Sequence, residues 1–125
     1  MREILFRGIR KDNDEWIEGN VLVPRICGDI YIAKQEAAFH CIHYAVNPET
    51  VGQYTGRKDG NYKKIFEGDI CELASVNFVV EFTDSKWNFR CLSGYYCEPD
   101  FHKHCADSKI VGNIWDNPEF MEEKI

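Results

Sequence analysis

The sequence lacks any long apolar segment, because charged residues interrupt its apolar runs after a few positions. A membrane-spanning helix needs about 20 consecutive apolar residues, so no such helix is expected. Arg2, Glu3, Arg7 and Arg10 also break the apolar core that a signal peptide would require. We therefore expect a protein that is made and kept in the cytoplasm.

An excess of positive charge is also missing. The chain has 15 Lys and Arg against 21 Asp and Glu, which gives a formal net charge of −6. A molecule with this balance repels phosphate backbones as a whole. Binding to nucleic acid would therefore require a local basic patch.

Linkers, internal repeats and low-complexity segments are absent as well. At 125 residues, of which 44% are hydrophobic and 14% aromatic, the chain is long enough for one cooperative core. It is too short for two separate domains of ordinary size. We expect a single domain over residues 1–125, with possible lobes at 1–50 and 51–125.

Short apolar or alternating runs between turn residues outnumber helical patterns, which predicts a compact, mainly β, antiparallel domain. The predicted strands are 3–8, 16–23, 29–33, 69–73, 76–82, 87–92 and 109–115. Segment 34–45 is ambiguous, since 35–38 can begin a helical turn while 39–44 alternates as a strand does. Asn117 and Pro118 predict the start of a short C-terminal helical turn. Residues 69–92 are similar in pattern to an SH3-like barrel.

The run VGQYTGRKDGNYKKIFEGDIC, residues 51–71, carries the strongest local signals. Asp59-Gly60 tolerates left-handed backbone angles, so 53–55 and 64–66 are expected to run antiparallel on either side of a bend. The bend bears Arg57, Lys58, Lys63 and Lys64. A second bend is expected at 67–69.

Three blocks of the sequence are informative together: MREILFRGIRKDNDEWIEGNVL at the start, NPETVGQYTGRKDGNYKKIFEGDI in the middle and IVGNIWDNPEF near the end. They resemble the YopX family of phage and prophage proteins. Their order and spacing match, so the resemblance spans almost the whole chain. It implies a small, mostly β protein of temperate phages or integrated elements of bacteria, with no established biochemical activity.

We predict a binding or interaction protein whose functional surface lies in the central block. The residues of this predicted surface are Tyr54, Thr55, Gly56, Arg57, Lys58, Asp59, Lys63 and Asp69. The expected partner is a phage or host protein, or a second copy of the chain joined through a free strand edge. Two alternatives stay open: the basic turn 57–64 binds nucleic acid, or it is a solvated hairpin tip.

Exposed aromatic side chains are further candidates for partner contact. They are Tyr44, Tyr54, Tyr62, Trp87, Tyr95, Tyr96 and Trp115. Of the three tryptophans Trp16, Trp87 and Trp115, we expect at least two to fill the core.

Cysteine and histidine residues form a possible structural zinc site. The candidate ligands are Cys91, Cys97, His102, His104 and Cys105, with a smaller group upstream at His40, Cys41 and His43. Thiolate and imidazole are the ligands that zinc prefers, but the spacing contains no paired Cys-x2-Cys knuckle. The alternative is small buried cysteines and exposed loop histidines, and we expect no cofactor. The six cysteines should stay reduced in the cytoplasm.

Catalysis is not expected, because no nucleophile, base and orienting group occur at a recognisable spacing. Asp59, Glu67 and Asp69 are carboxylates near the central turn, and Cys71 with His40 or His43 could form a thiol–base pair. Each has a simpler role: carboxylates after glycine satisfy turn donors, and a cysteine within a strand is fixed by packing.

Overall fold

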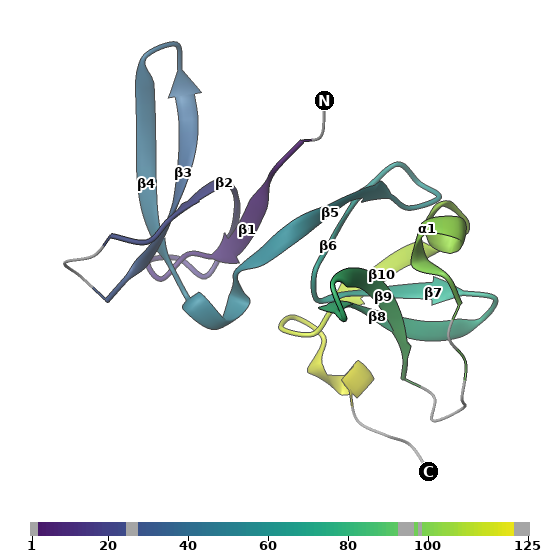
Figure 1. Cartoon of the computed structure of the whole chain (residues 1–125). Helices are drawn as coiled ribbons and strands as arrows, with labels where there is room; N and C mark the ends of the chain where they lie inside the picture. Colours follow the sequence, from purple (N-terminus) through teal and green to yellow (C-terminus); the bar gives the residue numbers. More distant parts are fainter. Residues whose placement is uncertain (1–2, 25–27, 93–96, 98, 122–125) are drawn as a thin grey trace. The chain divides into compact units, whose positions relative to one another are not determined.

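The computed structural model describes residues 3–24, 28–92, 97 and 99–121, and the chain divides into two compact units (Figure 1). The first unit is Met1–Tyr54 and the second is Thr55–Ile125. The sequence placed a possible boundary at 50/51, close to this division. Each unit has its own cluster of buried apolar side chains.

The first unit is an antiparallel sheet in the order β4-β3-β2-β1-β5. Its elements are β1 (Phe6–Ile9), β2 (Trp16–Leu22), β3 (Ile30–Ala37), β4 (His40–Val46), the 3-10 turn η1 (Pro48–Thr50) and the first residues of β5 (Gly52–Lys58). The core consists of Ile17, Ile32 and Val46. The hydroxyl of Thr50 accepts a hydrogen bond from the Ile9 N–H at 2.9 Å, which fixes η1 against β1.

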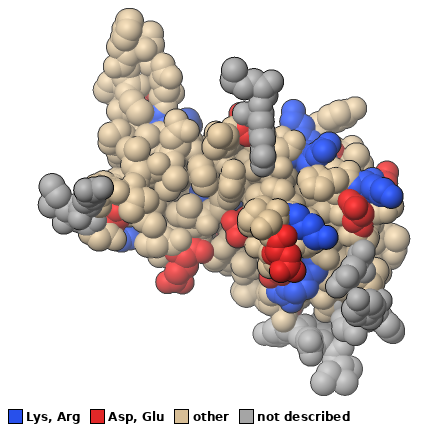
Figure 2. Space-filling model, viewed as in Figure 1, with Lys and Arg blue, Asp and Glu red and all other residues tan. Residues whose placement is uncertain are grey.

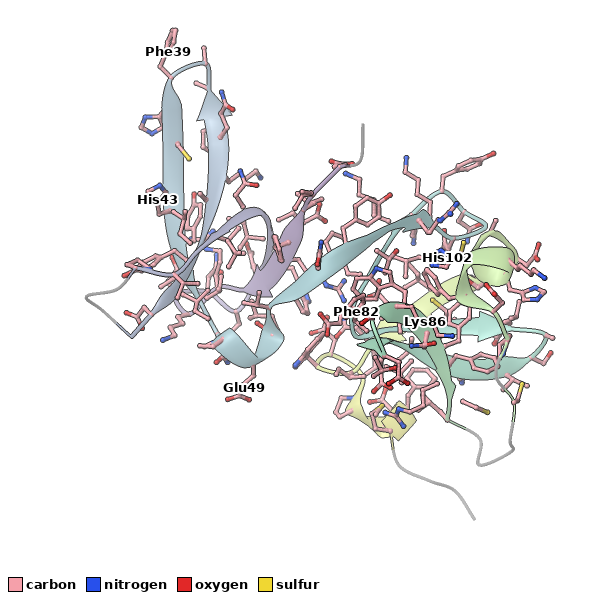
Figure 3. The ribbon with its side chains drawn as sticks, viewed as in Figure 1. Phe39, His43, Glu49, Phe82, Lys86 and His102 are labelled. Carbon is pink, nitrogen blue, oxygen red and sulfur yellow. The ribbon has the colours of Figure 1, made fainter. Side chains whose placement is uncertain are left out.

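Strands β3 and β4 form a long hairpin, called here the arm. The helical alternative for 35–38 is wrong, because β3 runs to Ala37 and the chain turns at Ala38 and Phe39 before β4. Every residue from 34 to 41 is exposed. Phe39 lies at the tip and is fully exposed (Figure 3). The outer half of the arm therefore packs on no core of the described residues.

The second unit contains a four-stranded antiparallel sheet in the order β10-β7-β8-β9. Its elements are β6 (Lys64–Phe66), β7 (Asp69–Leu73), β8 (Val76–Thr83), β9 (Lys86–Cys91), α1 (Phe101–His104), η2 (Cys105–Asp107), β10 (Lys109–Asn113) and η3 (Pro118–Met121). Strand β6 is the neighbour of β5. The core lies between the sheet and α1, and its largest members include Phe78, Phe89 and Phe101.

The mainly β, antiparallel architecture predicted from the sequence is confirmed, and each predicted strand overlaps an observed one. The strands of the described residues do not close into a barrel, so the SH3-like barrel is not confirmed. The C-terminal turn is a 3-10 turn over Pro118–Met121, and the rest of the predicted turn lies outside the described residues. Helix α1 was not predicted.

The tryptophan prediction is wrong, because only Trp87 is buried. Trp16 is half-buried beside Arg7, whose guanidinium lies 4.6 Å from the ring centre, and Trp115 is half-buried against Gly68.

No helix in the described parts of the chain is long and apolar enough to cross a membrane.

Candidate functional site

Residues 56–64, called here the cationic loop, comprise the end of β5, the bend 59–63 and the first residue of β6. The chain turns back as predicted: the Asp59 N–H donates to the Lys63 carbonyl at 2.9 Å, and the Tyr62 N–H donates to the Asp59 carbonyl at 3.1 Å. The left-handed residues, however, are Gly56 (φ 86°) and Tyr62 (φ 63°). The bend predicted from Asp59-Gly60 is therefore real, but neither of those two residues supplies its left-handed angle.

Asp59 organises the loop from inside. Its side chain is 3% exposed, and its Oδ1 accepts hydrogen bonds from the backbone N–H groups of Asn61 and Lys63, each at 2.9 Å. Its Oδ2 accepts a third from Ile110, also at 2.9 Å. One buried carboxylate thus satisfies three backbone donors, a type of charge-assisted bond stronger than a neutral one.

Gly60 attaches the loop to the segment before β10. Its N–H donates to the Ser108 carbonyl at 2.8 Å, and a Cβ at this position would lie 3.0 Å from the carbonyl oxygen of Ala106. The close approach leaves no room for a larger residue without a shift of the backbone. The cationic loop is therefore held at two points, to Ser108 and to Ile110 of β10.

The outer side of the loop presents cations. Arg57, Lys58 and Lys63 are exposed, and their side chains make no ion pair with any residue that the structure describes. Tyr62, between them, is 85% exposed. On the face of the second unit shown in Figure 2, lysine and arginine side chains are interspersed with aspartate and glutamate side chains. The surface of the loop can thus offer positive charge and one aromatic ring to a partner.

Half of the predicted binding surface is buried. Tyr54, Thr55, Asp59 and Asp69 are each at most 5% exposed, so they do not face a partner. Thr55 and Asp69 serve the backbone instead: the Thr55 hydroxyl accepts from the Arg57 N–H at 3.1 Å, and Asp69 accepts from the Phe66 N–H at 2.8 Å. The exposed remainder is Gly56, Arg57, Lys58 and Lys63.

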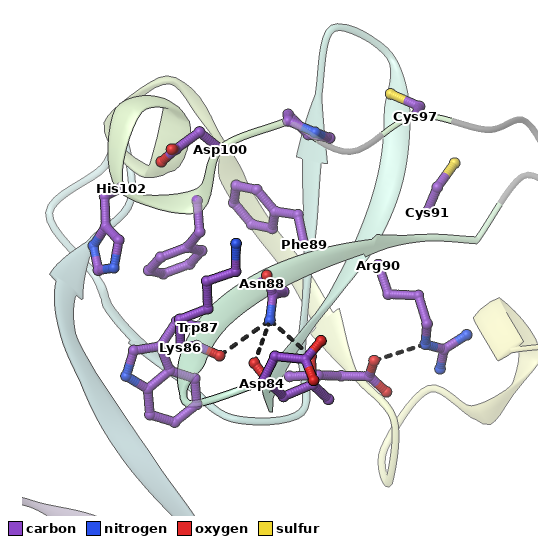
Figure 4. Close-up of a pocket in the computed structure, with 14 residues that line it drawn as sticks. Asp84, Lys86, Trp87, Asn88, Phe89, Arg90, Cys91, Cys97, Asp100 and His102 are labelled. Carbon is purple, nitrogen blue, oxygen red and sulfur yellow. Dashed lines mark hydrogen bonds and ion pairs between the residues drawn. The ribbon is translucent and has the colours of Figure 1, made fainter.

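A second candidate site is a pocket beside β9, which the sequence reasoning missed (Figure 4). It has a volume of about 520 Å³ and is lined by the end of β8, the following turn and β9, by Cys97 and Pro99, and by the start of α1. Its apolar surface includes the buried rings of Trp87 and Phe89. The Asn88 amide donates to Thr83 and Lys86, and Arg90 pairs with Glu81 at 2.8 Å. Its lining comes from residues of 81–91 and from residues 97 and 99–102, whose closeness no sequence motif signals.

The Cys and His residues do not form a metal centre in the described residues. No group of three or more metal-ligating side chains comes together there. Cys91, Cys97 and His102 line the pocket beside β9, Cys105 is buried, and His104 lies 3.7 Å from the Asp107 carboxylate. The upstream residues His40, Cys41 and His43 lie within β4, on the arm. The geometry therefore gives the zinc hypothesis no support.

Cys71 behaves as a packed side chain. It is fully buried in β7, and burial, together with the nearby Asp69 charge, raises the pKa of its thiol to about 12. A thiol with this pKa is not a thiolate near neutral pH and is a poor nucleophile. His40 and His43, the bases considered with it, belong to β4 of the first unit.

These features define a class of small β protein: two antiparallel units, one of which carries a fixed cationic loop. The chain belongs to the YopX family, because a protein-family model described as "YopX protein" matches residues 5–122.

The fold is similar to that of protein EF1440 from Enterococcus faecalis, known from a crystal structure. The two share 21% sequence identity with a TM-score of 0.58, over 98% of this chain and 100% of the other. At that identity the likeness concerns the fold alone. No curated protein matches the chain.

Proposed function

We propose that this protein is a non-catalytic binding module of phage or prophage origin, acting in the bacterial cytoplasm, whose cationic loop docks on an acidic surface of a partner protein. The supporting observation is the contrast within the loop. Asp59 is buried and holds the backbone, while Arg57, Lys58 and Lys63 point outward without an ion pair in the described residues.

A loop held in this way loses little conformational entropy when it binds. Its cations need not break existing ion pairs within the described residues before they meet a carboxylate. Tyr62 adds a large side chain with few rotatable bonds, of the kind enriched at the centre of interfaces. Charge would set the orientation and rate of docking, and the aromatic ring would add buried area.

Nucleic acid is the second candidate, favoured by one observation. Exposed Tyr62 lies next to Lys63 in a cationic loop, and aromatic rings beside cations are the means by which single strands are bound without sequence preference. The formal charge of −6 opposes this candidate, because the rest of the molecule repels phosphates.

The test compares the native chain with a double charge reversal, Arg57→Glu with Lys58→Glu, as baits for host-cell lysate. The matched control, Lys34→Glu with Lys86→Glu, changes the formal charge by the same amount at two exposed lysines that are not part of residues 56–64. A partner of the loop is captured by the native chain and by the control, but not by the loop variant. Equal capture by all three contradicts the proposal.

The two candidates are separated by titration of the native chain with a single-stranded and a duplex oligonucleotide at two salt concentrations. Phosphate binding weakens steeply as salt rises. Binding that has this salt dependence and is lost in the loop variant would favour nucleic acid. No binding to either oligonucleotide leaves an acidic protein as the partner.

A further inference from the structure

The outer half of the arm is a two-stranded ribbon. Strand β2 pairs with β3 only at Tyr31, Ile32 and Ala33, so beyond this point β3 has β4 alone as its neighbour among the described strands. Figure 1 shows β3 and β4 extending away from the other strands of the first unit. An isolated two-stranded hairpin is marginally stable in water, and a third strand is normally needed.

The two edges of the ribbon differ in charge. The β3 edge carries Lys34 and Glu36, whereas β4, from His40 to Val46, contains no Asp, Glu, Lys, Arg or Pro. Edge strands are usually protected against pairing by charges or proline. From His40 to Tyr44 the β4 edge has neither protection, whereas at Val46 it is bridged to Arg10, so the outer part of β4 is the edge at which a further strand can add.

The backbone groups available on this edge follow from one hydrogen bond. The Ala45 carbonyl accepts from the Lys11 N–H at 2.9 Å, on the side of β4 opposite to β3. Because the direction of N–H and C=O groups alternates along a strand, Cys41 and His43 direct their backbone groups to the same outer side. Figure 3 shows His43 on the outer side of β4, below Phe39 at the tip.

We propose that the strand that adds is β4 of a second copy of this chain, in an antiparallel pair with a two-fold axis at Ile42. In this register Cys41 of one copy lies opposite His43 of the other, and each such pair exchanges both of its N–H···O bonds. The outward-facing groups of both residues are then satisfied, while Ala45 keeps its bond to Lys11. Two arms together make a four-stranded sheet.

A second copy fits this edge better than an unrelated strand for two reasons. With a formal charge of −6 each, two copies repel one another, so they meet most favourably where neither strand is charged, and β4 is such a strand. The exposed Phe39 also gains a neighbour. With the axis at Ile42, Phe39 at the tip of one arm comes opposite Ala45 of the other copy. An interface of this kind is self-complementary, as two-fold symmetry requires.

The first test is the mass of the full chain in solution, measured by size exclusion with light scattering over a range of concentrations up to about 100 μM. The native chain should approach twice its 14.6 kDa. His43→Pro should return the mass to one chain, because it removes an N–H that faces outward and leaves the β3–β4 ladder in place. Glu36→Lys, a charge change on the opposite edge, should leave the doubled mass unchanged.

Ile42→Lys provides a second variant in case the proline disturbs the arm. It places like charges directly opposite one another across the two-fold axis and should also give a single chain. Circular dichroism checks that each variant is folded. A native chain that stays single at every concentration, or a doubled mass that survives both β4 variants, would overturn the proposal. If the native chain has the mass of one chain at every concentration, the strand that adds to β4 is not a second copy and would have to come from another protein.

A covalent test checks the register. His43→Cys puts a thiol opposite Cys41 of the other copy, about 5.5 Å away between Cα atoms, which is within the range of a disulfide. Oxidised glutathione would accept the two electrons and two protons released as the two thiols join. A reducible dimer on a non-reducing gel is expected, and adding Cys41→Ser should abolish it. A dimer that persists with Cys41→Ser, or none at all, contradicts this register.

Discussion

The carboxylate of Asp59 and the backbone N–H of Ile110, 51 positions apart, are joined by a hydrogen bond of 2.9 Å. This bond attaches the cationic loop to β10, the first strand in the order of the four-stranded sheet. The same carboxylate holds Asn61 and Lys63 within the loop. The position of the exposed cations thus depends on one buried acid.

Asp59→Ala should lower the free energy of unfolding by about 3 kcal/mol, because three backbone donors lose their acceptor and at least one of them is left without a partner. Asp59→Asn keeps one acceptor oxygen and should cost less. Urea unfolding followed by fluorescence measures both. Glu72→Ala, at an exposed site on β7, is the control and should change little. Equal stability of Asp59→Ala and the control would contradict the role of Asp59.

Gly68 and Gly56 allow backbone strain to be separated from a steric clash. Both have left-handed angles, φ 88° and φ 86°, but a Cβ at Gly68 would lie 2.3 Å from the Trp115 ring, while a Cβ at Gly56 would meet nothing within 4 Å. Gly56→Ala should cost about 1 kcal/mol, and Gly68→Ala about 3 kcal/mol. Thermal unfolding compares the two. Similar losses for both variants would show that the contact with Trp115 carries no cost.

The turn between β7 and β8 should be open to improvement. Ala74 and Ser75 have φ of 52° and 66°, and they link the paired residues Leu73 and Val76. Two-residue turns with these angles favour Asn-Gly, so the double change Ala74→Asn, Ser75→Gly should raise the free energy of unfolding by about 1 kcal/mol. The melting temperature measures the gain.

The β8–β9 turn is the comparison for this prediction. Asp84 and Ser85 have φ of 53° and 65°, and Asp already suits the first position. Ser85→Gly alone should therefore give a smaller gain than the Ala74 and Ser75 double change. A loss of stability in both turns would contradict the left-handed conformation of their central residues.

Cys71 should make stability fall in alkaline solution. The folded-state pKa is raised from 9.0 to about 12, so above pH 9 the unfolded chain loses the thiol proton while the folded chain keeps it. The contribution of Cys71 to the free energy of unfolding is complete below pH 9. It decreases as the pH rises toward the folded-state pKa, by up to about 1.4 kcal/mol per pH unit.

The measurement is the free energy of unfolding at several pH values from 8 to about 11, for the native chain and Cys71→Val. Other groups titrate equally in both proteins, so the difference between the two slopes belongs to Cys71. A steeper decline in the native chain is the expected result. Parallel curves would mean that the thiol titrates normally in the folded state.

Local sequence patterns were sufficient for most of the strands. The runs 69–73 and 76–82 predict β7 and β8 closely, because alternation of apolar side chains and two-residue turns are local properties. Helix α1 escaped prediction since it is one turn long, fixed by the Asp100 cap and by burial of Phe101 against β9. The ambiguous segment 34–45 contains the end of β3, a turn and most of β4, and pairing of these two strands with each other decided it.

For the site, residue types alone indicated where the positive charge lies but not which residues face solvent. In the sequence, Asp59 and Asp69 cannot be told apart from exposed aspartates. Only the structure shows that both are buried and that their carboxylates accept hydrogen bonds from backbone N–H groups. The pocket beside β9 joins residues from separate segments, so it has no sequence signature.

By itself, the sequence determined the family, the β class, the bend of the central block and the position of its cations, because these depend on neighbouring residues. The tertiary structure decided which members of that block are buried and which edge strand is uncharged and unprotected. Burial and strand pairing depend on contacts between distant positions, such as Asp59 with Ile110, and a linear pattern of residues does not specify such contacts.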